Sequence, residues 1–377
     1  MPLSRNKKVV FLTNIVAPYR VFLFNKLEEI RASSSFDFEV YFMRMTEADR
    51  NWDVKLSDLK FKYIVGNGFY LMIKGFHLHF NPVLIFKLIR SKHEIVLGSS
   101  WNDLNVLTIA LLKSFGLIKN KLSVWSEANY LTISSQKRSK IRDRLRKWFF
   151  LQIDGNFIVP GQMSIKSFEK WEIPVSKVVI LPNLVSSQIF KSNSLYKENL
   201  GEKPIFVMVA RLEENIKGIM NFFVSVGNEN LKKVIIRIAG TGSCFDDYIK
   251  YIQLNKLEQN IFLLGELSQE EVRLEYENAD VFVLPSYTDA SPLVLVEAIF
   301  SGLPILVSER CGNHFEAVIN GQNGYTFDPL NQTDIKNKFD LILSGRNKWK
   351  DFSKSSLQIA KSNFDSDSIL ASFIKSF

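Results

Sequence analysis

The segment that decides the fold runs from Val281 to Phe327 and reads VFVLPSYTDASPLVLVEAIFSGLPILVSERCGNHFEAVINGQNGYTF. Its first residues, VFVL, predict a short buried strand, and LVLVEAIF predicts a helix. We expect Ser291 to be the N-cap of this helix and Pro292 its first residue, because these residue types favour those positions. The helix is expected to run to about Ser301, with Gly302 past its end, before a second strand, PILVS. A strand, a loop, a helix and another strand in this order are typical of a parallel α/β sheet.

The same alternation extends outward from this segment. Upstream of it, strands are predicted at KKVVFLTN, FEVYFM, EIVLG, LSVWSE, GNFIVPG and KVVILPN, with helical stretches between them. A polar segment, residues 186–203, then separates this series from a second one that begins at PIFVMVAR. The chain has 377 residues, and domains commonly hold about 100–200, so two domains are favoured. We predict an α/β protein with two doubly wound, Rossmann-like domains, residues 1–185 and 204–360, which bind ligands between the carboxyl ends of their strands.

Composition and charge narrow the function classes. The chain is 46% hydrophobic and 23% charged, which excludes a wholly disordered or fibrous protein. The net charge of +9 is divided unevenly along the sequence. Residues 1–190 hold 28 basic and 15 acidic side chains, a net +13, and the remainder holds 20 and 24, a net −4. The two halves are therefore expected to face different partners.

Cysteine content and hydropathy predict a cytoplasmic protein that does not span a membrane. Cys244 and Cys311 are too few for a disulfide framework and have no zinc-type spacing, so two reduced thiols are expected. The N-terminus, MPLSRNKKVVFLTN, runs directly into a predicted strand and does not resemble a signal peptide. The longest uncharged runs are shorter than the roughly 20 apolar residues that a membrane-spanning helix needs.

Candidate chemistry is concentrated at the start of the helix in the Val281–Phe327 segment. The open backbone N–H groups of Leu293 and Val294 are expected to bind phosphate or sugar hydroxyls. Asp289 precedes the helix and Glu297 lies in its second turn, so two carboxylates can approach one ligand. The alternative is that Asp289 only forms a turn and that Glu297 is a solvated helix residue.

This segment resembles the nucleotide-sugar signature of the retaining glycosyltransferases of family four, the glycosyl transferases group 1 type, which have the GT-B fold. The signature has a strand ending in Pro-Ser, two acidic residues flanking a proline, a Gly-x-Pro step, and an acidic residue before an Asn-Gly turn. The matching residues here are Pro285, Ser286, Asp289, Pro292, Glu297, Gly302, Pro304, Glu316, Asn323 and Gly324. The chain departs from the family in having Asp289 where Glu is usual and Ala290 where Gly is usual.

The resemblance extends to the donor-binding residues upstream. Arg211 and Lys217, in VMVARLEENIKG, fall where the family has an Arg and a Lys-Gly. Two cations suit a leaving diphosphate, because negative charge grows on its oxygens as the glycosidic bond breaks. Gly240 and Thr241, in IRIAGTG, resemble the family's glycine-rich turn near the nucleotide. Taken alone, such cations are usually solvated and such glycines usually serve a tight turn.

The resemblance also implies a reaction. Glu297 would bind the ribose hydroxyls, and Asp289, a candidate catalytic residue, would hold the transferred sugar with the N–H groups of Leu293 and Val294. The acceptor hydroxyl would attack on the face from which the diphosphate departs, and the diphosphate would help to accept its proton. No protein nucleophile is assumed in this retaining reaction.

The first domain matches the family less closely. Arg20, in NIVAPYR, is a candidate for contact with phosphate or acceptor, or else a surface residue at a helix start. Glu127, at the end of LSVWSE, is the second catalytic candidate and stands near the place where many relatives have a His. His77 and His79 alternate on one face of a predicted strand. They are candidates for an acceptor pocket, with structurally satisfied imidazoles as the alternative.

No metal ion or other cofactor is expected. The triplet Asp365–Asp367 superficially resembles a metal motif of another glycosyltransferase fold. Its place before an apolar run, ILASFIKSF, favours helix capping instead. In GT-B enzymes the terminal helix often returns to the first domain, which the resemblance implies for residues 361–377.

Two basic stretches account for the charge of the first domain. Residues 59–93 hold six basic side chains, no acidic one and many interleaved aromatic residues. Residues 137–147 hold seven basic side chains and one acidic one, and Ile141, Leu145, Trp148 and Phe149 share a helical face there. We expect these stretches to contact an anionic membrane surface, with a core helix and a solvated basic face as the alternative. No nucleic acid partner is expected, because no nucleic-acid-binding module is present.

Together these features predict transfer of a hexose-type sugar from a nucleotide-diphosphate sugar to a glycan acceptor. The acceptor is expected to be lipid-linked, such as a polyprenyl-linked oligosaccharide, in lipopolysaccharide or capsule synthesis at the inner face of the cell membrane. Two rival functions stay open. One is a nucleotide-sugar epimerase or hydrolase of the same fold, and the other is a non-catalytic protein that binds sugar nucleotides or glycans.

Overall fold

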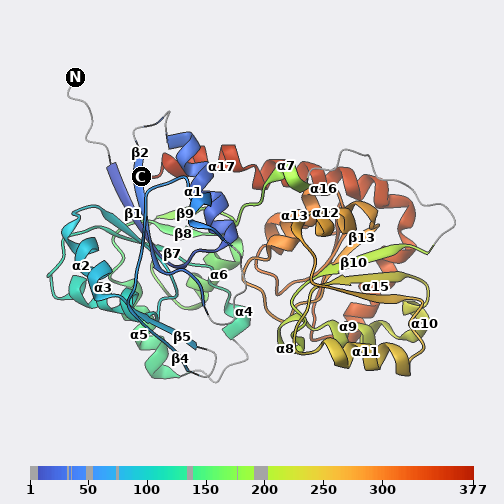
Figure 1. Ribbon diagram of the computed structural model, residues 1–377. Helices are drawn as coiled ribbons and strands as arrows, with labels where there is room; N and C mark the ends of the chain where they lie inside the picture. The colour runs from blue at the N-terminus through green and yellow to red at the C-terminus, as the bar shows by residue number, and fades with distance from the viewer. Residues whose placement is uncertain are drawn as a thin grey trace. The chain divides into compact units, whose positions relative to one another are not determined.

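The computed structural model describes residues 7–31, 34, 36–47, 54–73, 76–133, 139–175, 177–190 and 203–377. The chain divides into two compact units, both seen in Figure 1. Unit 1 comprises Met1–Tyr130, Gln136–Leu184 and Ser366–Phe377, and unit 2 comprises Leu131–Ser135 and Val185–Asp365. No helix in the described ranges is long and apolar enough to cross a membrane.

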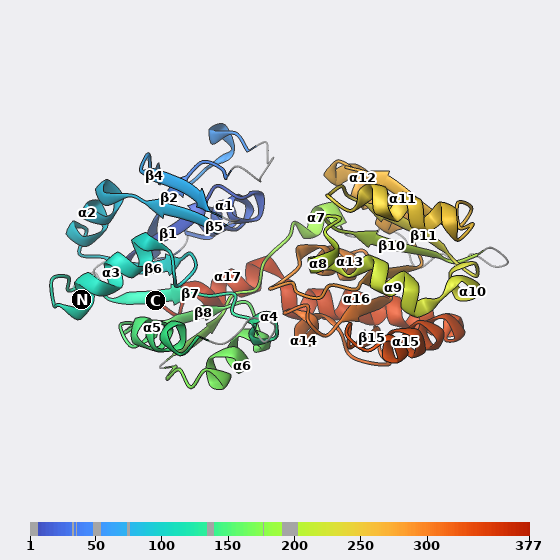
Figure 2. The same cartoon turned by 90° about the horizontal axis from the view of Figure 1, so that it is seen from below.

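Unit 1 is built on a sheet of seven parallel strands in the order β3-β2-β1-β6-β7-β8-β9. Its strands are β1 (Lys7–Ile15), β2 (Phe36–Arg44), β3 (Tyr63–Val65), β6 (Glu94–Gly98), β7 (Leu122–Trp125), β8 (Phe157–Val159) and β9 (Val178–Ile180). Figure 2 shows β2, β1, β6, β7 and β8 following one another across the unit. The strand order reverses between β1 and β6, so the carboxyl ends of these two strands mark the switch point where such sheets bind ligands.

Helices and one hairpin surround this sheet. The helices are α1 (Pro18–Arg31), α2 (Pro82–Arg90), α3 (Leu104–Ser114), α5 (Lys140–Phe150), α6 (Gln162–Lys170) and α17 (Ser366–Ile374), with the short helix η1 (Leu56–Asp58). Helix α4 (Tyr130–Ile133) crosses a boundary between the units: Tyr130 belongs to unit 1 and Leu131 to unit 2. The hairpin pairs β4 (Phe69–Ile73) with β5 (Phe76–Phe80) and lies outside the main sheet. Packed aromatic rings, among them Phe11, Phe24 and Trp125, fill the core between sheet and helices.

Helix α17 belongs to the core of unit 1, although it ends the chain. Leu370 and Phe373 are buried there, and the ring of Phe373 lies 6.3 Å from that of Phe11. Helix α16 (Trp349–Phe364) packs in unit 2 up to its last residue, so the return starts at Ser366 and not at residue 361. The predicted return of the terminal helix to the first domain is confirmed.

Unit 2 is a second parallel sheet, with six strands in the order β12-β11-β10-β13-β14-β15. They are β10 (Ile205–Val209), β11 (Ile235–Ala239), β12 (Ile261–Gly265), β13 (Val281–Leu284), β14 (Ile305–Ser308) and β15 (Gly324–Phe327). Side chains of β10 alternate between two cores, because Phe206 and Met208 face one cluster and Val207 faces the other. The prediction of two doubly wound α/β domains is confirmed.

The helices of unit 2 cover both faces of its sheet. They are α7 (Ser187–Phe190), α8 (Glu214–Lys217), α9 (Ile219–Val226), α10 (Asn228–Leu231), α11 (Phe245–Leu254), α12 (Gln269–Asn278), α13 (Leu293–Phe300), α14 (His314–Ala317), α15 (Gln332–Ser344) and α16, with η2 (Arg346–Lys348). Figure 1 shows α9 and α11 on one side of the sheet and α12 and α13 on the other. The sheet is thus buried on both faces, which explains its nearly continuous apolar strands.

Two sequence expectations differ from the structure. The predicted linker, residues 186–203, begins with helix α7, whose Phe190 is buried in unit 2 and lies 6.0 Å from the ring of Tyr276. The rest of that segment, residues 191–202, lies outside the described residues. In α5, Ile141 and Leu145 are exposed while Phe149 is fully buried, so these residues do not form one core-facing stripe. Arg146 is buried instead, with its guanidinium 4.0 Å from the ring centre of Trp171.

The return of α17 leads to a stability prediction. Phe373→Ala should lower the free energy of unfolding of unit 1 by about 3–5 kcal/mol, because it opens a cavity in the aromatic core. Ser372→Ala, one residue away on the exposed side of the same helix, should stay within about 0.5 kcal/mol of the unaltered chain. Urea unfolding followed by tryptophan fluorescence measures both, and coincident curves for the two variants would contradict the packing of α17 on unit 1.

Candidate functional site

The site in unit 2 lies where strands β10 and β13 end side by side. These two strands are parallel neighbours. Strands β11 and β12 are added on the β10 side and strands β14 and β15 on the β13 side, so the carboxyl ends of β10 and β13 form the switch point of the sheet. Lys217 ends helix α8 in the connection that follows β10, and the loop after β13 carries Asp289. Lys217 Nζ lies 2.6 Å from Asp289 Oδ2, and both side chains are largely covered. The structure thus brings together two of the predicted site residues in one ion pair.

A glycine makes the approach of these two loops possible. Gly218 ends helix α8 in the left-handed region, with φ of 62°, and a Cβ there would lie 2.8 Å from the carbonyl oxygen of Pro285. Beside it, the N–H of Tyr287 donates a hydrogen bond of 2.8 Å to the carbonyl of Ile216. Any other residue at position 218 would clash with the backbone and strain its own, so the glycine fixes the position of Lys217.

Glu214 holds the same loop in place, and the sequence analysis missed it. Its carboxylate accepts hydrogen bonds from the N–H groups of Met220 (2.8 Å) and Asn221 (3.1 Å) at the start of α9. It also accepts one from the hydroxyl of Tyr248, whose pKa is raised by burial and by this carboxylate. The available signal was an acidic residue shortly before the apolar run that forms α9, which is typical of a group that stabilises a helix N-terminus.

The glycine-rich turn after β11 lies directly against the loop of Arg211. A Cβ on Gly240, whose φ is 133°, would lie 1.9 Å from the carbonyl oxygen of Ala210. The N–H of Leu212 donates to the carbonyl of Thr241 at 2.8 Å. Arg211 itself is exposed to solvent at this edge of the sheet. The three candidates Arg211, Gly240 and Thr241 therefore share one edge, next to the loop that carries Lys217.

The loop of Asp289 is fixed by a second loop that the sequence analysis did not single out. The N–H of Gly312 donates to the carbonyl of Asp289 at 2.9 Å, and the side-chain amide of Asn313 donates to the carbonyl of Pro292 at 2.9 Å. A Cβ on Gly312 would lie 1.8 Å from the carbonyl oxygen of Ala290. The available signal was a glycine at the carboxyl end of the strand next to β13, where neighbouring loops must pass each other closely.

Helix α13 starts at Leu293, one residue later than the sequence predicts. Pro292 is its N-cap, with φ of −63° and ψ of 121°, and no side chain caps the helix, so the expectation that Ser291 would do so is wrong. Because Pro292 occupies the cap position, Ser291 lies one residue before it. The N–H groups of Leu293 and Val294 donate to no oxygen of the described residues, as expected for a site that binds an anion or hydroxyls.

Glu297 is held in the second turn of α13 by a buried tyrosine. The hydroxyl of Tyr276, a fully buried residue of α12, donates to Glu297 Oε2 at 3.0 Å. Burial raises the pKa of Glu297 to about 7, and the hydrogen bond from Tyr276 offsets part of that rise. The alternative of a solvated helix residue is therefore wrong, and near neutral pH this carboxyl group exists in both protonation states.

In unit 1, Arg20 and Glu127 form a pair at the carboxyl end of the sheet. Arg20, near the start of α1, is 5% exposed, and its guanidinium lies 3.5 Å from the ring centre of Trp125. Its Nη2 lies 3.3 Å from Glu127 Oε1, just beyond β7. The alternative of a surface arginine is wrong. Glu127 keeps part of its side chain exposed and is positioned by a cation that the aromatic ring of Trp125 covers.

His77 and His79 both project from β5 into a group of polar side chains. His77 Nδ1 lies 2.8 Å from the hydroxyl of Tyr70. His79 is buried between Glu47 and Asp103, with its nitrogens 3.5 Å and 3.6 Å from their carboxylate oxygens. No group of three or more His, Cys, Asp or Glu side chains within the described ranges is arranged to hold a metal ion.

Comparison with known proteins shows which family this chain resembles. Residues 191–358 match the family model of glycosyl transferases group 1, which confirms the resemblance seen in the sequence. The chain is 28% identical over 178 residues to the N,N'-diacetylbacillosaminyl-diphospho-undecaprenol alpha-1,3-N-acetylgalactosaminyltransferase of Campylobacter jejuni, a match that covers 47% of this chain and 45% of that protein. It is 30% identical over 228 residues to the alpha-monoglucosyldiacylglycerol synthase of Acholeplasma laidlawii, covering 58% of this chain and 50% of that one. The chain thus spans about half the length of these curated relatives.

The whole fold is also found among solved structures. HepE of Anabaena, solved in complex with UDP, superimposes with a TM-score of 0.74 over 98% of both chains, at 17% sequence identity. At this identity the likeness concerns the fold alone, and it confirms the predicted GT-B architecture of two Rossmann-like domains.

The environment of Glu297 leads to a prediction about pH. Its pKa is about 7 in the folded protein and close to 4.5 when the chain is unfolded, so between these values the folded state binds more protons. The free energy of unfolding should therefore fall as the pH rises from about 4.5 to 7, by roughly 3 kcal/mol at most. Glu297→Gln should remove this loss, and urea unfolding from pH 5 to pH 8 measures it.

A matched control is Glu258→Gln, which alters an exposed carboxylate of unit 2 and should keep the pH dependence of the unaltered chain. Parallel pH profiles for Glu297→Gln and the unaltered chain would show that the carboxyl group of Glu297 is not buried as described.

Proposed function

We propose, on the premise that residues 191–358 belong to the glycosyl transferases group 1 family, that this protein is a retaining glycosyltransferase. It moves a hexose-type sugar from a nucleotide-diphosphate sugar to a hydroxyl group of a glycan acceptor. The observation that carries the proposal is the Lys217–Asp289 ion pair at the switch point of unit 2, where open helix N–H groups also lie. Unit 2 takes the donor and unit 1 the acceptor.

The donor is bound by groups that the fold has already positioned. Arg211 and Lys217 face the diphosphate. The guanidinium of Arg211 can donate two hydrogen bonds to it and the ammonium of Lys217 acts as a point charge, and both stabilise the negative charge that develops on the leaving group. Glu297, with Tyr276 behind it, accepts hydrogen bonds from the ribose hydroxyls when it is ionised. HepE, which shares this fold and was solved in complex with UDP, supports a nucleotide-linked donor.

Asp289 positions the transferred sugar and does not attack it. Its carboxylate is tied to Lys217 at 2.6 Å, which keeps one oxygen next to the cation that faces the diphosphate. A carboxylate held in this way accepts a hydrogen bond from a sugar hydroxyl but is a poor nucleophile. The acceptor hydroxyl then attacks from the side of the departing diphosphate, which takes up its proton, so the anomeric configuration is retained.

We propose that the protein's own cations and helix N–H groups replace a metal ion at the diphosphate. Two kinds of group support this proposal. Arg211 and Lys217 are cations, and the N–H groups of Leu293 and Val294 are neutral dipoles that donate hydrogen bonds. No bound cofactor is then required beyond the donor substrate.

Two relatives suggest the acceptor class. The name of the Campylobacter relative includes a diphospho-undecaprenol acceptor, and that of the Acholeplasma relative a diacylglycerol lipid. We therefore propose a lipid-linked acceptor, such as a polyprenyl-linked oligosaccharide, and a role in surface polysaccharide synthesis at the inner face of the cell membrane.

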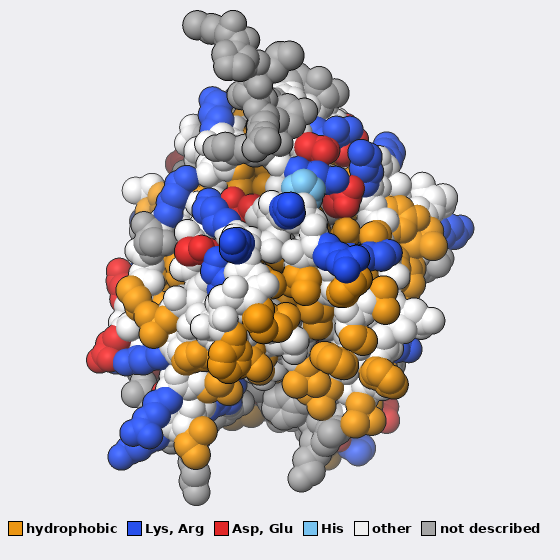
Figure 3. Space-filling model, turned by 90° about the vertical axis from the view of Figure 1, so that its left-hand side faces the viewer, with side chains coloured by type: hydrophobic (Ala, Val, Ile, Leu, Met, Phe, Trp, Pro, Cys, Tyr) orange, Lys and Arg blue, Asp and Glu red, His pale blue; other side chains and the backbone are white. Residues whose placement is uncertain are grey.

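Unit 1 has a surface suited to such a membrane. Large hydrophobic side chains are exposed on the hairpin, on α2, on α3 and the loop after it, and on α5; we call these the apolar face. They are Phe69, Leu71, Met72, Val83, Phe86, Leu104, Leu111, Phe115, Leu117, Ile141, Leu145 and Leu151. Figure 3 views the side of unit 1 on which α2 and α3 lie in Figure 1, and hydrophobic side chains gather over its centre and lower part. Exposed apolar surface of this extent marks an interaction site.

Charge complementarity favours an anionic bilayer as the partner of the apolar face. Exposed basic residues lie on the same elements, among them Lys87 and Arg90 on α2 and Lys140 and Arg144 on α5. Near an anionic membrane each such cation contributes about 1 kcal/mol, and the apolar side chains between them enter the headgroup region. The net +13 of residues 1–190 has the sign that this contact needs.

Loss of the cations at the switch point tests the donor site. Arg211→Ala and Lys217→Ala should each lower the rate of sugar transfer by about 100-fold or more, because the leaving diphosphate loses a stabilising charge. Donors are first selected by the thermal shift that UDP-, GDP- and ADP-sugars produce in the unaltered protein. Transfer is then measured by mass spectrometry of the product.

Lys232→Ala, which removes an exposed lysine of unit 2 that pairs with Glu229, is the matched control and should transfer at the unaltered rate. Full activity in EDTA and a product of unchanged anomeric configuration are expected. Unaltered transfer in both site variants would refute the donor site, and donor turnover without acceptor would favour the epimerase or hydrolase.

Liposome flotation tests the apolar face. The protein should float with phosphatidylglycerol-rich vesicles and less so as salt rises, because salt screens the attraction. Phe86→Asp and Ile141→Asp should each weaken binding by about tenfold or more. Each substitution removes apolar area that the bilayer covers on binding and adds a negative charge that anionic lipids repel. Leu254→Asp, at an 83% exposed leucine of unit 2, should bind like the unaltered protein. Equal flotation of all three variants would rule out the apolar face.

A further inference from the structure

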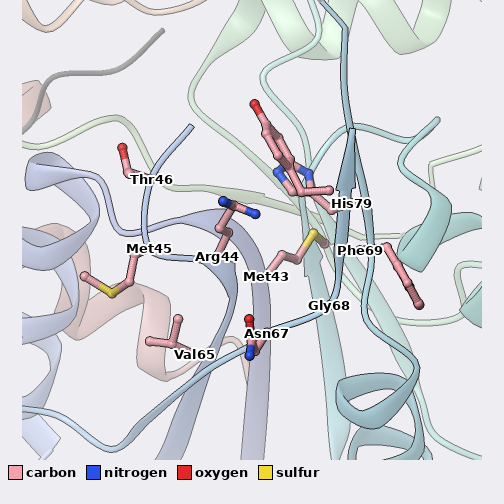
Figure 4. Close-up of a pocket in the computed structure, with 11 residues that line it drawn as sticks. Met43, Arg44, Met45, Thr46, Val65, Asn67, Gly68, Phe69 and His79 are labelled. Atoms are coloured by element: carbon pink, nitrogen blue, oxygen red, sulfur yellow. The ribbon is translucent and has the colours of Figure 1, made fainter. Parts of the chain in front are cut away.

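A pocket of about 250 Å³ lies within unit 1, apart from the residues of the donor site. Its walls come from the end of β2, the loop that follows β3, and the β4–β5 hairpin, as Figure 4 shows. Polar groups lining it include Arg44, Thr46, Asn67, Tyr70 and His79, and Met43, Met45 and Val65 supply apolar wall. The pocket sits at the carboxyl end of β2, the edge of a parallel sheet at which ligands bind.

The imidazole of His79 is the group in this pocket that most needs a partner. It is 3% exposed, and its Nε2 makes no hydrogen bond with any described residue, although it lies 3.5 Å from Glu47 Oε1. Its Nδ1 lies 3.6 Å from Asp103 Oδ2. Both ring nitrogens face these carboxylates, and the imidazole also lines the pocket. Buried polar atoms of native proteins are usually hydrogen-bonded, and unsatisfied buried groups are often found at binding sites.

The surroundings of His79 are rigid. The other carboxylate oxygen of Asp103 accepts from the N–H of Asn105 at 2.9 Å and so caps helix α3. The side chain of Asn105 in turn accepts from the N–H of Asn81 at 2.6 Å. The pocket wall is therefore preformed on the side of the imidazole, which lowers the entropic cost of binding.

The opposite wall is held equally closely. The amide oxygen of Asn81 accepts from the N–H of Gly68 at 2.9 Å. A Cβ on Gly66 would lie 2.5 Å from the amide oxygen of Asn81. A Cβ on Gly68 would lie 2.2 Å from the carbonyl oxygen of Phe80. Both glycines let the loop after β3 lie flat against the base of the hairpin, which brings Asn67 and Tyr70 to the pocket.

The charges near the pocket favour a neutral ligand. Among the described residues that line the pocket, Arg44 is the one with a fixed positive charge, and its guanidinium lies 4.3 Å from the ring centre of Tyr70. The two buried carboxylates of Glu47 and Asp103 lie directly behind the imidazole of His79. A phosphate against that imidazole would face both carboxylates at short range, which is costly in a poorly hydrated site.

The lining combines hydroxyl, amide and imidazole groups with methionine and valine side chains. This mixture suits a ring that is polar at its edges and apolar on its faces. We propose that this pocket binds a single neutral sugar ring of the acceptor, in contact with the imidazole ring of His79. Its volume is below the roughly 300–1,000 Å³ of sites for larger ligands, which limits it to one small ring. The inference rests on the proposed function for calling that ring part of the acceptor, whereas binding of the ring stands on the pocket alone.

The chain holds four histidines, which makes the test direct. Full-length protein labelled in its histidine rings is titrated with methyl α-glucopyranoside and with the methyl glycoside of N-acetylglucosamine, and separately with inorganic phosphate. At least one glycoside should shift the ring signals of His79 with saturation, while His93 and His314 stay unmoved as internal references. No saturable shift with either glycoside, or a saturable shift with phosphate instead, would overturn the proposal.

A matched pair of variants locates the binding. Thr46→Val removes a hydroxyl from the pocket wall and should weaken glycoside binding at least fivefold, whereas Thr108→Val on α3, outside the pocket, should leave it unchanged. Equal affinities of the two variants would place the ring elsewhere. Because no donor is present, these titrations are independent of sugar transfer: failed transfer with intact shifts refutes the proposed function alone, and intact transfer without shifts refutes the pocket alone.

Discussion

The close approach of the loops after β10 and β13 is the constraint on which the site of unit 2 depends. Two chain segments can pass each other at this distance only because position 218 has no Cβ and tolerates a left-handed backbone. That contact places Lys217 beside Asp289, and the hydrogen bonds of Glu214 prevent the lysine loop from relaxing away. The same solution recurs at Gly240 and Gly312, where glycines again let neighbouring loops touch. The polar groups at this edge are therefore fixed before any ligand arrives.

Buried polar groups are the second common feature, and they carry a cost. Glu297 is kept in surroundings that raise its pKa to about 7, and Arg20 is enclosed beside Trp125 with one of its nitrogens unpaired among the described residues. His79 stands between two buried carboxylates. Each arrangement sacrifices some folding stability, because a desolvated charge or an unpaired donor is unfavourable. Their gathering at the carboxyl ends of two parallel sheets is typical of binding sites rather than of structural cores.

The basic excess of the chain has a different origin from the proposed donor site. Arg211 and Lys217 lie in the half with a net charge of −4, whereas the excess lies in the half that carries the apolar face. Helix α5 shows how the two properties combine: Ile141 and Leu145 are exposed among arginines, while Arg146 is buried against Trp171. The sequence pattern of α5 is that of an ordinary amphipathic helix with one face in the core. In the structure only part of that face is covered, because packing against neighbouring elements decides which turns are buried.

The sequence by itself determined the alternation of strands and helices, the presence of two Rossmann-like domains, and the positions of Asp289, Glu297, Arg211 and Lys217 after their strands. These follow from local rules, since hydrophobic period and the chemistry of glycine and proline act over a few residues. Only the tertiary structure decided which of these groups meet. Lys217 and Asp289 are 72 residues apart, and their contact depends on strand order and on a glycine whose role is visible only beside Pro285. The tyrosine behind Glu297, the carboxylates around His79 and the absence of a Ser291 cap are likewise outcomes of packing between distant segments, which no local pattern encodes.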